Sequence, residues 1–208
     1  MKSWSVPRAA GQNADLSRDG AADLVVRVGT TLRMFLQRTD AMGKATGKFD
    51  AQGDFSLPLD AVAGDLAIGE FRGKGQHEIL ISTQPLSGNS QLFAVGLGSD
   101  RRTWSSQGTM ANTLLNASAM SIGDFNRDGQ PDIVLIDKTN ELMSVTTWRT
   151  PSEPRTRAYY VGHSPAAVTV GAIDDDDLPD LAFAVQVSSQ PGFISLSTVY
   201  SLPMGGLP

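Results

Sequence analysis

Short apolar runs recur along the chain and predict most of its strands. Four of them each follow a loop rich in polar and charged residues, at 24–26, 79–81, 133–136 and 181–185. Runs of this length, rich in β-branched residues and bounded by polar turns, are typical of strands buried on both faces. Further strand-like segments follow at 31–37, 91–96, 142–148 and 193–200. No long helical period appears, so the pattern predicts an all-β protein.

The loops before these runs are copies of one another. Counting Asp124 as position 1, oxygen-bearing side chains occupy positions 1, 3, 5 and 9 of the loop. The same frame starts at residues 15, 70, 124 and 172, with spacings of 55, 54 and 48 residues. The four positions hold Asp15, Ser17, Asp19 and Asp23 in the first loop; Glu70, Arg72, Lys74 and Glu78 in the second; Asp124, Asn126, Asp128 and Asp132 in the third; and Ala172, Asp174, Asp176 and Asp180 in the fourth.

Apolar and glycine positions repeat in the same frame. Positions 2 and 10 are apolar in all four loops, and position 6 is glycine in three loops and Asp177 in the fourth. Glycine is the residue best suited to a positive φ angle, and Asp is among the better substitutes. Agreement at these additional positions indicates a genuine internal repeat.

Each repeat has room for one four-stranded antiparallel sheet. The order strand, loop, strand, turn, strand, turn, strand in about 52 residues is typical of a propeller blade. The repeats lie approximately at 8–59, 60–111, 112–163 and 164–208, with 1–7 added to the last. We therefore predict a single all-β domain, a β-propeller with about four blades in this chain, either as a closed small ring or as part of a larger ring.

The loop pattern is not that of an EF-hand. An EF-hand loop needs a bidentate acid at position 12 and helices on both sides. Position 12 here is Leu135 in the third loop and Val26 in the first, and the flanking segments are strand-like. The Asp-x-Asp/Asn-x-Asp-Gly-x-x-Asp pattern instead resembles the FG-GAP/VCBS repeats of integrin-α-like β-propellers. In that family the loop joins the first two strands of a blade and binds calcium.

The resemblance implies calcium ligands in three of the four loops. Calcium takes six to eight oxygen ligands in irregular geometry, which alternating carboxylates and a backbone carbonyl supply. The expected ligands are Asp15, Ser17, Asp19, Asp23 and the Ala21 carbonyl in the first loop; Asp124, Asn126, Asp128, Asp132 and the Gln130 carbonyl in the third; and Asp174, Asp176, Asp180 and the Leu178 carbonyl in the fourth. Ala172 contributes no side-chain ligand, a loss that Asp175 and Asp177 offset only electrostatically.

The second loop is expected to hold no metal. Arg72 and Lys74 replace two ligands, and either cation can pair with Glu70 or Glu78. The four loops together contain 13 of the 22 acidic residues, and carboxylates packed this closely repel one another without a cation. Three calcium ions would change the formal charge from −5 to +1. The metals are therefore predicted to be structural and not catalytic.

The sequence offers few other candidates for catalytic or binding residues. Neither His77 nor His163 joins a recognisable constellation, and no nucleophile elbow, phosphate loop or zinc spacing occurs. The aromatic residues in predicted outer strands and turns either fill space between blades or, where exposed, stack on sugars or anchor a protein partner. We expect one or two exposed residues among Trp4, Trp104, Trp148, Tyr159, Tyr160 and Tyr200.

Composition narrows the function classes. The acidic balance and lack of a basic patch argue against nucleic acid, no segment is apolar enough to insert in a membrane, and the absence of cysteine excludes disulfides. We expect an extracellular or cell-surface module that binds protein or carbohydrate, since integrin-type propellers bind proteins and certain related propellers are lectins. The alternatives are a scaffold segment of a larger bacterial surface protein or toxin and, more remotely, a polysaccharide-active enzyme.

Closure of the ring is the last expectation. The fourth repeat lacks an obvious fourth strand, whereas a strand-like segment at 2–6 precedes the first loop. Propellers protect their open edges by letting one end of the chain complete a blade begun by the other. We predict that 2–6 pairs beside 193–200, within one chain or across a homodimer. The alternative is that the chain is a fragment whose ends are unpaired, with the remaining blades in a longer chain.

Overall fold

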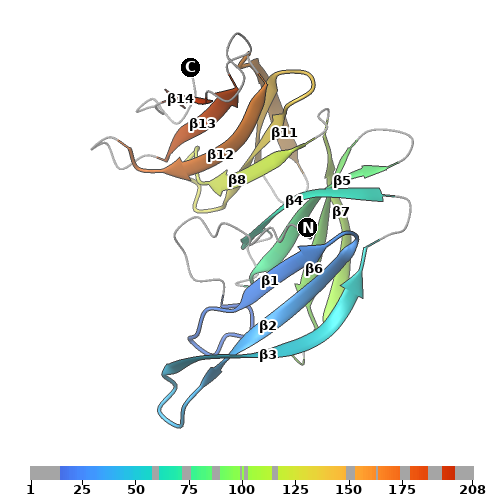
Figure 1. Ribbon diagram of the computed structural model, residues 1–208, viewed down its shortest axis with the longest axis vertical. Coiled ribbons are helices and arrows are strands. Elements are labelled where there is room, and N and C mark those ends of the chain that lie inside the picture. The colour runs from blue at the N-terminus through green and yellow to red at the C-terminus, as the bar shows by residue number, and fades with distance from the viewer. Residues whose placement is uncertain are drawn as a thin grey trace.

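The computed structural model consists of β-strands joined by turns (Figure 1). It describes residues 15–57, 61–71, 76–85, 90–98, 100, 103–113, 117–148, 153–162, 164–173, 179–186 and 194–199. Within these ranges there is no helix, and so none that could span a membrane. The predicted all-β class is confirmed.

The strands form four antiparallel sheets, each from a continuous part of the chain, and strands consecutive in sequence pair with each other. The first sheet contains β1 (Leu24–Val28), β2 (Thr31–Thr39) and β3 (Ala45–Ser56). The second contains β4 (Ala61–Gly69), β5 (Glu78–Pro85), β6 (Gln91–Leu97) and β7 (Trp104–Asn112). The third contains β8 (Ala119–Gly123), β9 (Asp132–Asp137), β10 (Leu142–Trp148) and β11 (Pro154–Tyr160). The fourth contains β12 (Pro165–Gly171), β13 (Asp180–Gln186) and β14 (Ile194–Val199).

The predicted strands coincide with observed ones. The apolar runs after the loops lie in β1, β5, β9 and β13, and all six residues of β9 are buried. The later segments correspond to β2, β6, β10 and β14, of which β10 has the predicted limits 142–148. The loops join the first two strands of the second, third and fourth sheets, as the repeat predicts.

Strands β5 and β9 are buried on both faces because each packs between two neighbouring sheets. In β9, Ile133 joins a hydrophobic cluster with the second sheet and Val134 joins one with the fourth. In β5, Ile79 faces the first sheet and Leu80 faces the third. The side-chain period of two in a strand thus supplies both interfaces from one short apolar run.

The four sheets pack in chain order. Three hydrophobic clusters join the first sheet to the second, the second to the third and the third to the fourth. The first strands of the last three sheets, β4, β8 and β12, lie next to one another (Figure 1). Among the described residues no cluster joins the first sheet to the fourth, and no closed ring is shown. The predicted partner strand 2–6 lies outside the described residues, so its pairing stays a prediction.

A tryptophan connects the first sheet to the second. Trp104, at the start of β7, donates its indole N–H to the Gly53 carbonyl in β3 over 2.6 Å. Its ring also lies 6.0 Å from that of Phe55, at 45°. Because the aromatic contact and the hydrogen bond both cross the interface, the edge of the first sheet is fixed at two points.

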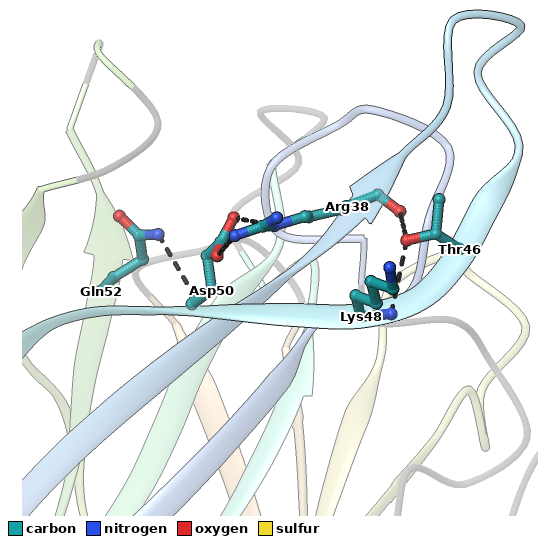
Figure 2. Close-up of polar contacts among 5 residues, drawn as sticks. All are labelled: Arg38, Thr46, Lys48, Asp50 and Gln52. Atoms are coloured by element: carbon teal, nitrogen blue, oxygen red, sulfur yellow. Dashed lines mark hydrogen bonds and ion pairs between the residues drawn. The ribbon is translucent and has the colours of Figure 1, made fainter.

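The β2–β3 hairpin is longer than the pattern predicts and extends well past β1 (Figure 1). Strand β1 pairs with β2 only as far as Leu24 opposite Phe35, and beyond this point β2 pairs with β3 alone. We call residues 36–50 the hairpin arm. Figure 2 shows that Arg38 and Asp50 face each other across the arm in a bidentate ion pair.

Candidate metal centre

The third loop, which joins β8 to β9, is wound around its own carboxylates. Asp124 accepts the backbone N–H of Asp128 at Oδ1 (3.0 Å) and that of Gly129 at Oδ2 (2.9 Å). Asp128 in turn accepts the Gln130 N–H at Oδ1 (2.8 Å) and the Asn126 side-chain amide at Oδ2 (2.9 Å). The predicted ligands of this loop are therefore joined into one compact turn.

Asp132 closes this loop at position 9 and is almost fully buried, with 1% of its surface exposed. Its Oδ2 accepts the Phe125 N–H over 2.9 Å, whereas its Oδ1 has no hydrogen-bond partner in the described part of the chain. Burial raises the pKa of Asp132 to about 7; the backbone N–H groups of Phe125 and Asn126 oppose the rise, and the carboxylates of Asp128 and Asp124 add to it. A buried carboxylate oxygen without a donor is costly unless a cation satisfies it.

The first loop repeats the same hydrogen bonds. Asp15 accepts the backbone N–H groups of Asp19 (3.0 Å) and Gly20 (2.9 Å), and Asp19 accepts that of Ala21 (2.9 Å). These three bonds join positions 1 to 5, 1 to 6 and 5 to 7, which are the pairs joined in the third loop. The sequence repeat is therefore also a repeat of local structure.

The two loops share left-handed backbone at two positions. Position 6 has positive φ at Gly20 (84°) and Gly129 (82°), as the glycine pattern predicts. Position 4 is also left-handed, at Arg18 (59°) and Arg127 (56°), which the sequence analysis missed. The identical residue at position 4 of both loops was the available signal.

Replacing Gly129 with Ala should destabilise the protein by about 1 kcal/mol, because an L-residue with positive φ brings its Cβ close to the following carbonyl oxygen. An added Cβ would meet no atom within 4 Å, so backbone conformation alone is tested. Gly171→Ala is the matched control, since that site is equally open and its φ is not positive. Urea unfolding in chelator measures both; equal stabilities of the two variants would contradict the prediction.

Position 9 differs between the two loops. Asp23 is bonded at both oxygens, with Oδ2 accepting the Ser17 N–H (2.8 Å) and Oδ1 accepting the Gln37 N–H of β2 (2.9 Å). Burial raises the pKa of Asp23, and these bonds lower it in part. The Ser17 hydroxyl is buried beside the same carboxylate and also lowers its pKa. The loop pattern does not mark Gln37 as a partner, because it lies 14 residues from Asp23 in the chain.

The second and fourth loops are described only in part. In the fourth, Asp180 accepts the Ile173 N–H over 2.8 Å, the same position-9 to position-2 bond as in the third loop. The other expected ligands of that loop, Asp174, Asp176 and Leu178, lie outside the described residues. So do Asp175 and Asp177, which are expected to offset the missing side-chain ligand at Ala172. In the second loop Glu78 is buried, while Arg72 and Lys74 fall outside the described ranges, so the predicted ion pair stays a prediction.

The described acidic side chains do not already converge as a cation site. In the described ranges, no three Asp, Glu or His side chains lie close enough together to hold a metal. In the first and third loops the carboxylates at positions 1 and 5 instead bond backbone amides of the same turn. Each carboxylate oxygen has a second lone pair, so these bonds leave capacity for a cation. The donor set is all oxygen, and the unpartnered Asp132 Oδ1 fits a hard cation such as calcium.

The aromatic and histidine residues that the sequence offered as candidates differ in their solvent exposure. Trp148 is buried, Trp104 and Tyr159 are half-buried, and Tyr160 is 74% exposed. Trp4, Tyr200 and His163 are outside the described residues, and His77 is half-buried. One of the four described aromatic candidates is thus exposed, which is within the expectation of one or two.

Tyr160 is fixed by a glutamate that the sequence analysis did not select. Its hydroxyl donates to Glu141 Oε2 over 2.7 Å, and this bond raises the pKa of Tyr160. Glu141 has a positive φ of 57° and accepts the Val161 N–H at its carbonyl. The ring is therefore held at the turn between the third and fourth sheets with its surface in solvent.

Comparison with protein-family models found no match for this chain, and comparison with curated proteins also found none.

Proposed function

We propose that the first, third and fourth loops bind calcium ions that stabilise the fold. The observation that carries this proposal is Asp132 Oδ1, a buried carboxylate oxygen with no donor, inside a loop whose other side chains offer only oxygen ligands. The shared backbone of the first and third loops supports equivalent sites. When bound, calcium would neutralise the clustered carboxylates; the loops supply the oxygens and hold them through backbone hydrogen bonds.

The four sheets are, in this proposal, successive blades of a β-propeller. Antiparallel sheets in chain order, with first strands β4, β8 and β12 adjacent, support this arrangement. Each sheet also packs face to face on the next, as blades do. The ring is completed by the segment 2–6 beside β14, by a second copy, or by further repeats of a longer chain.

Calorimetric titration with calcium tests the metal sites. Asp128→Ala removes a ligand from the most complete loop and should abolish one binding event while leaving the others. Glu153→Ala is the matched control because it removes one exposed acidic side chain outside the loops. Equal titration of the two variants would argue against binding at the third loop.

The module's role is to bind a protein or carbohydrate outside the cell. Rigid frames with loop-rich faces suit recognition, and Tyr160 offers an exposed ring with a hydroxyl bonded to a carboxylate. A glycan array probed with the calcium-loaded protein should show a signal that Tyr160→Ala removes. Binding that is unchanged in this variant would exclude the ring from the site, and a blank array would favour a protein partner.

A further inference from the structure

The hairpin arm depends on contacts at its base for stability. It extends beyond β1 as two strands, and two-stranded hairpins are only marginally stable by themselves. Besides its strand pairing and the hydrogen bonds of its turn, the arm is joined by the Arg38–Asp50 pair and by the Thr46 hydroxyl, which donates to the Arg38 carbonyl over 2.8 Å (Figure 2). Nearly all of β3 is exposed, so burial contributes little to holding the arm.

Gln37 lies at the base of the arm and connects the arm to the first loop. Its backbone N–H donates to Asp23 Oδ1 over 2.9 Å. Its side-chain amide, oriented so that both of its atoms are satisfied, donates to the Ala22 carbonyl (3.1 Å) and accepts the Gly47 N–H (3.3 Å). One residue thus bonds positions 8 and 9 of the loop and the opposite strand of the arm.

Within the described ranges, the third loop has no such link. Position 10 of the loop faces Phe35 in β2 of the first sheet and Thr146 in β10 of the third. Two residues further along these strands lie Gln37 and Trp148, so Trp148 is the equivalent of Gln37. Asp132 Oδ1, which corresponds to the oxygen held by Gln37, has no partner among the described residues. Coupling through this carboxylate is therefore expected in the first loop and not in the third.

We propose that Gln37 is a positioning residue that couples cation binding in the first loop to the order of the hairpin arm. The inference rests on the proposed calcium site. A cation and the Gln37 N–H hold the same Asp23 carboxylate, which has lone pairs for both. Once one of them has fixed this side chain, the other loses less conformational entropy on binding, so the coupling is positive. Thermodynamic linkage makes the effect reciprocal.

Amide hydrogen exchange followed by NMR tests the first direction. Calcium should slow exchange of the Asp40 and Gly43 amides, which close the turn of the arm, by about fivefold. Gln37→Ala loses the side-chain bonds to the Ala22 carbonyl and the Gly47 N–H but keeps the backbone N–H that Asp23 accepts, so it should reduce this protection without abolishing it. Gln37→Asn, whose shorter amide cannot span both partners, should restore little of the lost protection. The Gly20 and Gly129 resonances report calcium in the first and third loops of the same samples.

Site-resolved titration tests the reciprocal direction. Arg38→Ala breaks the Arg38–Asp50 pair in the arm and should weaken calcium binding at Gly20 about fivefold without changing it at Gly129. Arg33→Ala is the matched control, because it breaks a similar pair with Asp54 where β1 still flanks the hairpin. It should leave both affinities unchanged.

The outcomes separate the two proposals. If the Gly20 resonance does not shift with calcium, the calcium site of the first loop is wrong and the coupling with it. A Gly20 resonance that responds while the arm amides do not overturns the coupling alone. The same holds if Arg38→Ala weakens both loops equally, or if Arg33→Ala weakens the first loop as much as Arg38→Ala does.

Discussion

Removing calcium should lower the melting temperature of the protein by about 10 °C. A ligand of the folded state alone, at ten times its dissociation constant, adds about 1.4 kcal/mol per site. Three sites then add about 4 kcal/mol, a large share of the stability of an ordinary domain, and each kcal/mol moves the midpoint by about 2–4 °C at this size. The physical source of the loss is repulsion between carboxylates of one loop, of Asp19 with Asp23 and of Asp124 and Asp128 with Asp132.

Scanning calorimetry in chelator and in millimolar calcium measures this effect. Magnesium at the same concentration is the control for ionic strength and for nonspecific cation binding, because it demands near-ideal octahedral geometry and retains its water. A melting temperature that is the same in chelator and calcium would contradict a structural role for the loops.

Asp132→Asn should stabilise the calcium-free protein at pH 8 and remove part of the stabilisation by calcium. The folded protein raises the pKa of Asp132 from an ordinary 3.8 to about 7, so the folded state favours the protonated form. Stability from this group is fully present below pH 4 and is lost as the pH rises through about 7. The neutral amide avoids this loss, which amounts to a few kcal/mol, but it is a poorer calcium ligand.

The comparison is urea unfolding of wild type and variant at pH 4 and pH 8 in chelator, then at pH 8 in calcium. Their stabilities should be similar at pH 4, and the variant should be more stable at pH 8 in chelator. Its gain from calcium should be smaller by about one site, about 1.4 kcal/mol at ten times the dissociation constant.

Asp137→Asn is the control for this experiment. Asp137 is also buried, but its carboxylate accepts the N–H groups of Thr139 and Asn140 and the Asn140 side-chain amide. Its replacement should destabilise the protein with and without calcium. A destabilised Asp132→Asn in chelator at pH 8 would mean that the orphaned oxygen is not a source of instability.

The sequence by itself determined the strands that follow the loops, the strands paired with them and the frame of the loops, because these depend on residues close together in the chain. The apolar run at 133–136 requires a strand with two covered faces, and β9 has them. The glycine at position 6 permits positive φ at no steric cost, and Gly20 and Gly129 adopt it. Asp15 and Asp124 bond amides four and five residues away, so local spacing is sufficient to predict their turns.

Only the tertiary structure decided how the equivalent loops differ. Asp23 and Asp132 occupy the same position of the repeat, yet Asp23 meets the Gln37 amide from another strand and Asp132 Oδ1 meets no donor in the described part of the chain. Likewise Glu141 and Tyr160 lie 19 residues apart and meet only because β10 and β11 pair. Such contacts depend on strand register and on how far the β2–β3 hairpin extends past β1. Those features follow from the packing of whole sheets, which the spacing of residues along the chain does not encode.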